Sequence, residues 1–288
     1  MAGPVKAAAA AALVSLWAGA ALAQEFVPPS SRTSAPAEQA RAALGTPGRP
    51  KIVIAGDSTA AEYEADRYPQ MGWGQVLKCS LDGEVDVLNA ARGGRSTKSF
   101  IAEGLFSDMI KQVSPGDTVL IQFGHNDAAL GRPERFTEAE GDYRDLLRAY
   151  VAVVRARRAV PVLITPVTRR IWKNGQAQPS HAAYGAVVRR VAAETRTPLI
   201  DLAATSRSLV QSLGEDGSKR LYLHLTPADG VARFPQGAAD DTHFNERGAR
   251  TMAGLVAAGL KATGAPVAVH VRAAPGGEAP VLGRPDCP

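Results

Sequence analysis

Short, continuously apolar runs alternate with longer amphipathic stretches along most of this chain, and that alternation constrains its fold more than any other feature. Five runs are brief, rich in Val, Ile and Leu, and bounded by Gly, Pro or Asp: KIVIAG (51–56), VDVLNAA (85–91), TVLIQFG (118–124), VPVLITPV (160–167) and PLIDL (198–202). Such runs are typical of strands buried on both faces. We expect helices in the longer stretches: 73–81, 97–113, 137–157, 180–195 and 245–262. The repeated order predicts an α/β domain with a central parallel sheet of about five strands flanked by helices.

The N-terminus has the layout of a secretory signal peptide. Lys6 precedes an Ala- and Leu-rich run, and small residues end that run just before Gln24. We therefore assign 1–23 as a cleaved signal, exclude it from the fold and expect a periplasmic or secreted protein with no membrane attachment. An uncleaved signal anchor is the alternative, which the short length of the apolar run disfavours.

Two further segments flank the expected α/β domain, 51–263. The first, 24–50, is rich in Pro, Ser and Ala and is typical of a flexible linker. The second, the tail 264–288, contains one β-prone piece, VAVHV (267–271), which either adds an edge strand or stays loose. Nothing in the sequence indicates a stable oligomer, and we expect a monomer.

Charge and cysteine content narrow the class of protein. The formal net charge is +5, but the Arg-rich positive charge is dispersed and lacks the consecutive basic residues and interleaved aromatics of a nucleic-acid-binding arm. We therefore expect no nucleic-acid partner. After export, Cys79 and Cys287 would meet an oxidising compartment, where a disulfide is possible. Spacing alone does not fix pairing, so this disulfide stays open.

Polar, Gly-containing sequence follows three of the predicted strands. The first ends in Gly56-Asp57-Ser58, the second in the turn 92–96 and the third in the turn 124–127. Because ligands of parallel α/β sheets bind beyond the carboxyl ends of the strands, we expect these turns to converge. A fourth polar cluster, 240–243, precedes the last long helix, which begins near Asn245.

These clusters contain the groups that acyl transfer requires. A serine hydroxyl is a weak nucleophile until a base removes its proton, and a carboxylate orients that base. Ser58 can be the nucleophile, His243 the base and Asp240 the carboxylate, because the three-residue spacing lets Asp240 curl back onto the imidazole. Asp241 competes for that role but, two residues before His243, is less well placed.

Donors for a developing oxyanion are also present in the predicted turns. The backbone N–H of Ser58, the N–H of Gly94 and the side-chain amide of Asn126 supply one donor from each turn, and a missing Cβ at Gly94 lets the backbone approach a substrate. Taken singly, each residue has a simpler explanation: Ser58 can cap a helix, and His243 or Asn126 can satisfy local backbone groups. Their joint occurrence at four expected strand or helix ends favours catalysis.

The four clusters, taken in order, resemble the sequence blocks of a known hydrolase superfamily. GDST (56–59), GGRS (93–96), GHND (124–127) and DDTH (240–243) resemble the blocks of the SGNH (GDSL) hydrolases, and the variants are most similar to the rhamnogalacturonan acetylesterase branch. The resemblance covers about 51–262. It implies a three-layer flavodoxin-like α/β fold and metal-independent removal of acetyl groups from pectic polysaccharides. Carried over block by block, it gives these roles: nucleophile Ser58; oxyanion donors Gly94 and Asn126 with the Ser58 amide; base and carboxylate His243 and Asp240.

Other kinds of hydrolase are disfavoured. No G-x-S-x-G elbow and no P-loop spacing occurs. The five His residues are widely separated and form no H-x-x-x-H or Cys–His group, so we expect neither a metal nor another cofactor.

Substrate residues are harder to predict. Trp73 can stack on a sugar ring or pack in the core, and Arg95 can attract a uronate carboxylate or only hold its own loop. The expected substrate is an acetylated polysaccharide or oligosaccharide. Two alternatives stay open: a broad carboxylesterase or lysophospholipase of the same superfamily, and a secreted carbohydrate-binding protein that has lost turnover.

Overall fold

The computed structural model describes residues 48–272 and 281–288. The expected signal peptide, 1–23, and the linker residues 24–47 lie outside the described residues. One parallel sheet has the strand order β2-β1-β3-β4-β7. Its strands are β1 (Lys51–Gly56), β2 (Asp86–Asn89), β3 (Thr118–Gln122), β4 (Val160–Ile164) and β7 (Leu199–Ile200). The predicted five-stranded parallel sheet flanked by helices is confirmed.

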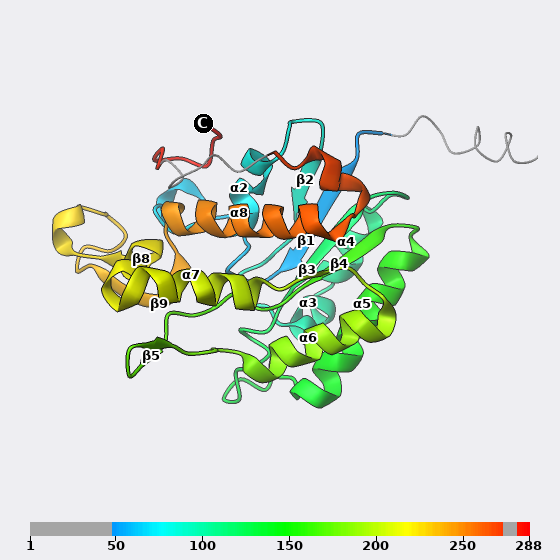
Figure 1. Ribbon diagram of the computed structural model, residues 1–288, viewed down its shortest axis with the longest axis horizontal. Coiled ribbons are helices and arrows are strands. Elements are labelled where there is room, and N and C mark those ends of the chain that lie inside the picture. Colours follow the sequence, from blue (N-terminus) through cyan, green and yellow to red (C-terminus); the bar gives the residue numbers. More distant parts are fainter. Residues whose placement is uncertain (1–47, 273–280) are drawn as a thin grey trace, which may run out of the picture. The chain divides into compact units, whose positions relative to one another are not determined.

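Helices cover both faces of this sheet (Figure 1). The α-helices are α2 (Trp73–Val76), α3 (Thr97–Ala102), α4 (Leu105–Lys111), α5 (Arg144–Ala156), α6 (Ala182–Thr195), α7 (Leu202–Gly217) and α8 (Glu246–Thr263). The stretch 97–113, predicted as one helix, divides into α3 and α4 at Gly104, which adopts a φ of 79° that favours glycine. Helix α7 was not expected from the sequence.

Alternate residues of β1 enter two separate hydrophobic cores, as the two-residue period of a strand requires. Ile52 and Ile54 pack with the apolar faces of α2, α7 and α8. Val53 and Ala55 pack with α3, α4, α5 and α6 on the opposite face. All four side chains are fully buried, which explains why the β1 sequence is continuously apolar and not alternating.

Two short hairpins lie outside the main sheet. They are formed by β5 (Trp172–Lys173) with β6 (Gln176–Ala177), and by β8 (Tyr222–Leu225) with β9 (Ala238–Phe244). Short 3-10 or π-helical turns complete the described chain: η1 (Ala65–Arg67), η2 (Leu77–Ser80), η3 (Ala139–Tyr143), η4 (Ser218–Leu221), η5 (Pro227–Asp229) and η6 (Pro266–His270). No helix in the described ranges is long and apolar enough to cross a membrane.

The β-prone piece VAVHV does not form an edge strand. It lies in η6, where Pro266 occupies the start of the turn and the consecutive residues Val267 and Ala268 are buried. Consecutive burial fits a helical turn better than a strand, in which neighbouring side chains point to opposite faces. Only Val271 makes a bridge, with Leu81.

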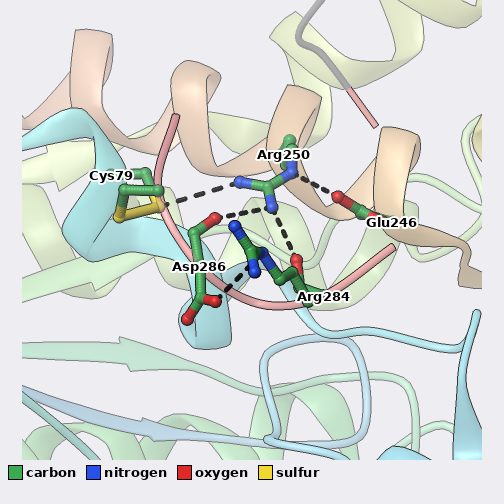
Figure 2. The surroundings of a disulfide bond; sticks show 6 residues. Cys79, Glu246, Arg250, Arg284 and Asp286 are labelled. Carbon is green, nitrogen blue, oxygen red and sulfur yellow. Dashed lines mark hydrogen bonds and ion pairs between the residues drawn. A yellow bond between two sulfur atoms is a disulfide. The ribbon is translucent and has the colours of Figure 1, made fainter. Parts of the chain in front are cut away.

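A disulfide joins Cys79 in η2 to Cys287 near the C-terminus (Figure 2). This settles the pairing that the sequence left open. The same C-terminal segment is bound by α8: Arg250 donates to the carbonyls of Arg284 and Asp286, each at 2.8 Å. The buried Glu246 carboxylate accepts from the amides of 282 and 283. The segment is therefore fixed against the first turns of α8.

Removing this disulfide should lower the stability of the domain. The bond closes a loop of 208 residues, and a native disulfide contributes about 2–4 kcal/mol by restricting the unfolded chain. Cys287→Ser should therefore lower Tm by roughly 5–10 °C, measured by calorimetry on purified protein. A reductant should lower the Tm of the wild type towards that value and leave the variant unchanged. Equal Tm values for the wild type and Cys287→Ser without reductant would contradict the prediction.

Candidate active site

Ser58 sits in a tight turn directly beyond the end of β1. The turn closes because the carbonyl of Asp57 accepts from the amides of Ala60 and Ala61, at 3.2 and 3.1 Å. The Asp57 side chain is fully buried and accepts from the amide and hydroxyl of Thr59. These bonds fix the backbone on both sides of Ser58, which stays partly exposed. The turn thus presents the hydroxyl at the carboxyl edge of the sheet.

A continuous hydrogen-bonded chain links Ser58 to His243 and Asp240. His243 Nε2 lies 3.0 Å from Ser58 Oγ, and His243 Nδ1 lies 2.7 Å from Asp240 Oδ2. Burial alone would raise the pKa of Asp240, but hydrogen bonds from the His243 side chain and backbone and the nearby imidazole lower that pKa to about 2. Asp240 is therefore ionised at neutral pH and holds the proton of His243 on Nδ1.

An irregularity in the β8–β9 hairpin makes this geometry possible. Leu223 pairs with Asp240, whereas the preceding residue, Tyr222, pairs with Phe244, so three residues of β9 have no counterpart on β8. The extra residues let Asp240 Oδ1 accept from the amides of Thr242 and His243, at 2.7 and 2.9 Å. The expected backward curl of Asp240 is present, and it lies in a bulged strand.

The neighbouring carboxylate, Asp241, makes a separate set of contacts. Its Oδ1 lies 2.7 Å from His224 Nε2 and 2.9 Å from an Arg170 nitrogen. Arg170 also donates its backbone amide to the Asp241 carbonyl and its guanidinium to the Glu215 carbonyl. Asp241 therefore ties β9 to the segment after β4 and does not contact His243. No sequence motif pointed to Arg170 or His224.

The turns that follow β2 and β3 converge on the serine turn. A Cβ built on Gly93 would lie only 3.8 Å from the Ser58 Cβ. Gly94 adopts a φ of 79°, a conformation that favours glycine. Asn126 donates one amide hydrogen to the Arg95 carbonyl at 3.0 Å, which leaves its second N–H as a further donor. The structure thus brings together the three turns predicted to supply oxyanion donors.

Arg135, which the sequence analysis did not identify, holds two of these turns together. One of its guanidinium nitrogens lies 3.0 Å from Asn126 Oδ1 and 3.2 Å from the Gly94 carbonyl. The first contact orients the Asn126 side-chain amide. Because Oδ1 accepts from Arg135, Nδ2 must point away from Arg135. Arg135 comes from a loop with no recognisable motif, so only the fold reveals this role.

Buried Asp127 connects the turn that follows β2 to the turn that follows β3. It accepts from the amide and hydroxyl of Thr97 and from the hydroxyl of Thr137. Burial raises the pKa of Asp127 to about 6, and the hydrogen bonds from the two threonines offset only part of that effect. The carboxyl group thus anchors the start of α3 to the turn that contains Asn126.

The two residues predicted to bind substrate, Trp73 and Arg95, have other contacts. Trp73 is fully buried and its indole donates to Gln122 Oε1 at 2.7 Å, so no face is available for a sugar ring; the substrate contact predicted for Trp73 is wrong. Arg95 donates to Glu103 Oε2 and to the Gly93 carbonyl. These bonds agree with the alternative in which Arg95 holds its own loop.

In residues 48–272 and 281–288, no group of three or more His, Cys, Asp or Glu is arranged to hold a metal ion. The arrangement of Ser58, His243 and Asp240 suits acyl transfer, in which a serine, an imidazole and a carboxylate act in series beside several N–H donors.

Comparison with known proteins agrees with this geometry. Residues 54–251 match the model of the GDSL-like lipase/acylhydrolase family. A probable rhamnogalacturonan acetylesterase of Bacillus subtilis, YesY, is 38% identical over 216 residues, covering 75% of this chain and 94% of that protein. The rhamnogalacturonan acetylesterase RhgT of the same species is 35% identical, covering 77% of this chain and 94% of RhgT.

Solved structures show the same fold. The crystal structure of YxiM from Bacillus subtilis superimposes with a TM-score of 0.64 at 29% identity, covering 76% of this chain and 58% of that longer one. The acetylxylan esterase Axe2 of Geobacillus stearothermophilus superimposes with a TM-score of 0.54 at 19% identity, covering 73% of this chain and 93% of Axe2. At that identity the second likeness concerns the fold alone.

Proposed function

This chain belongs to the GDSL-like lipase/acylhydrolase family, and from that premise we propose that it is a carbohydrate acetylesterase that removes O-acetyl groups from pectic rhamnogalacturonan. One observation carries the proposal: the hydrogen-bonded series from Ser58 Oγ through His243 to Asp240, with distances of 3.0 and 2.7 Å. The rhamnogalacturonan acetylesterases among its relatives support the choice of ester and polymer.

In the first half of the reaction, Ser58 Oγ attacks the acetyl carbonyl carbon as its proton passes to His243 Nε2. The negative charge that develops on the carbonyl oxygen is stabilised by the N–H groups of Ser58 and Gly94 and the free amide hydrogen of Asn126. His243 then gives the proton to the sugar oxygen as the ester bond breaks. The sugar leaves with a free hydroxyl, and an acetyl group remains on Ser58.

In the second half, a water molecule replaces the sugar. His243 Nε2 removes one proton from that water, and the oxygen attacks the acetyl carbon. The same donors stabilise the second oxyanion, after which the proton returns to Ser58 and acetate leaves. Asp240 keeps its negative charge throughout and stabilises the imidazolium that forms in both halves.

Export is part of the proposal. The Cys79–Cys287 disulfide supports it, because disulfides persist in oxidising compartments and are rare in the cytosol. The composition of residues 1–23 supports a cleaved signal.

Expression of the full chain in a bacterial host should give a mature protein that begins at Gln24 and is found outside the cytoplasm. N-terminal sequencing and fractionation check this directly. A protein that keeps Met1 in the cytoplasmic fraction would contradict export and leave the esterase proposal intact.

The substrate proposal is tested by acetate release from acetylated rhamnogalacturonan and acetylated xylan, beside p-nitrophenyl esters of increasing chain length. The wild type should release acetate from rhamnogalacturonan and prefer acetyl over long acyl esters. Ser58→Ala should lose at least about 10³-fold in kcat on every ester and still bind the oligosaccharide. A preference for long acyl chains would favour the lipase-like alternative. Binding without turnover by the wild type would favour the inactive carbohydrate-binding protein.

Two adjacent carboxylates provide a matched test of the proposed roles. Asp240→Asn should lower kcat by about 10⁴-fold, because the amide no longer holds His243 in the required tautomer. Asp241→Asn makes the same chemical change one residue away and should lower kcat by a much smaller factor, since Asp241 contacts His224 and Arg170. The measurement is kcat on p-nitrophenyl acetate, with circular dichroism to check folding. Similar losses in both variants would argue against the assigned role of Asp240.

A further inference from the structure

A concave site separate from the serine turn lies at the same edge of the sheet, beyond the ends of β4 and β7. It is a pocket of about 230 Å³ between the segment after β4 and the first turns of α6 and α7. Ligand sites for drug-sized molecules span roughly 300–1,000 Å³, so this pocket suits one small group and not a length of polymer.

The charge of the pocket favours an anion. Among the described residues that line it, the titratable ones are His181, Arg189 and Arg207, and none is an Asp or Glu. Burial, together with the nearby His125, lowers the pKa of His181 to about 2, so that imidazole is neutral near pH 7. The positive charge in the lining therefore comes from the two guanidinium groups.

The two arginines differ in their availability. Arg189 makes a bidentate pair with Asp201, with both N···O distances at 2.8 Å, and the same carboxylate also accepts from Thr165 and from the amide of Ala204. Arg207 is exposed, and no hydrogen bond or ion pair of its guanidinium occurs within residues 48–272 and 281–288. Arg207 is thus the cation in the pocket that can receive a ligand.

The start of one helix adds to the positive potential. Ala182 and Gly185 from the first turn of α6 line the pocket, and no side chain caps that helix. Ala203 and Ala204 from the first turn of α7 also line the pocket, but their amides donate to Thr165 Oγ1 and Asp201 Oδ1 and offer a ligand no free donor. Backbone N–H groups and the helix dipole favour a negative group at the start of α6.

Contacts link this pocket to the serine turn. The His181 ring, which lines the pocket, packs on the His125 ring with centroids 4.3 Å apart. His125 Nδ1 lies 3.3 Å from Asp57 Oδ2, and Asp57 immediately precedes Ser58. In the sheet, β4 is two strands from β1, or about 10 Å at normal strand spacing. One extended polymer can therefore reach both places.

We propose that this pocket binds the carboxylate of a uronate residue in the substrate polymer while an acetyl ester a few sugars away lies at Ser58. The proposal rests on the proposed function. Arg207 supplies the bidentate contact, and the uncapped start of α6 supplies further N–H donors. The pocket then selects acidic acetylated polymers over neutral ones, which the catalytic groups themselves do not distinguish.

Kinetics with a matched charge change test the pocket. Arg207→Gln should raise KM for acetylated rhamnogalacturonan oligosaccharides about tenfold, with little change in kcat and a much smaller change in KM for p-nitrophenyl acetate. Lys261→Gln, which removes one positive charge from the exposed far end of α8, should shift neither KM. Equal changes of KM on both substrates in Arg207→Gln, or no change on either, would overturn the proposal.

A binding experiment without hydrolysis separates this proposal from the proposed function. Digalacturonate, galactobiose and acetate are titrated into the wild type and into Arg207→Gln by NMR. We expect digalacturonate to bind the wild type, to bind the variant at least about tenfold more weakly, and to exceed both other probes in affinity. Failure of digalacturonate to bind, or equal binding of acetate, would overturn the uronate site even if rhamnogalacturonan is deacetylated. Digalacturonate binding that depends on Arg207 would support the site even if that polymer is not the substrate.

Discussion

Parallel pairing of β1 with β2 on one side and β3 on the other places the carboxyl ends of three strands at one edge of the sheet. Each of these strands continues into a polar turn, so three loops meet without any long connection. Because β1 lies between β2 and β3 and is buried on both faces, its end cannot shift without disturbing both cores. The position of Ser58 is therefore determined by the packing of the whole domain.

Buried carboxylates then fix the turns to one another. Asp57 and Asp127 are both fully buried, and an ionised group in such a place is costly unless it is hydrogen-bonded or paired. Burial would raise the pKa of Asp57, but the nearby His125 and the hydrogen bonds from Thr59 lower that pKa. For Asp127 burial prevails and its pKa is raised to about 6. The burial of these two carboxyl groups is unfavourable by itself, but their hydrogen bonds define the geometry of the turns. Perturbed pKa values of this kind are common near active sites.

The sequence predicted those parts of the fold that depend on local patterns. Continuous apolar runs identified the five strands, and their polar ends identified the turns around Ser58, Gly94 and Asn126. It did not predict α7, whose buried stripe of Leu202, Ser206 and Val210 has a serine at its centre. The Ser206 hydroxyl donates to the carbonyl of residue 202 and accepts from the amide of residue 168, so the position is satisfied by tertiary contacts. Because a polar residue fills the centre of this buried stripe, the sequence of α7 shows no helical repeat of apolar residues.

The catalytic carboxylate shows why local and tertiary information must be combined. Three-residue spacing correctly suggested that Asp240 can reach the imidazole of His243, but a regular strand would point these two side chains to opposite faces. The bulge in β9 removes that conflict, and Arg170 holds the bulged strand by bonding both the backbone and the side chain of Asp241. Two residues before Arg170, Thr168 lines the pocket assigned to a uronate. The segment after β4 therefore contacts both the strand that carries the base and the site proposed to select the polymer, so changes in this segment should alter specificity and catalysis together.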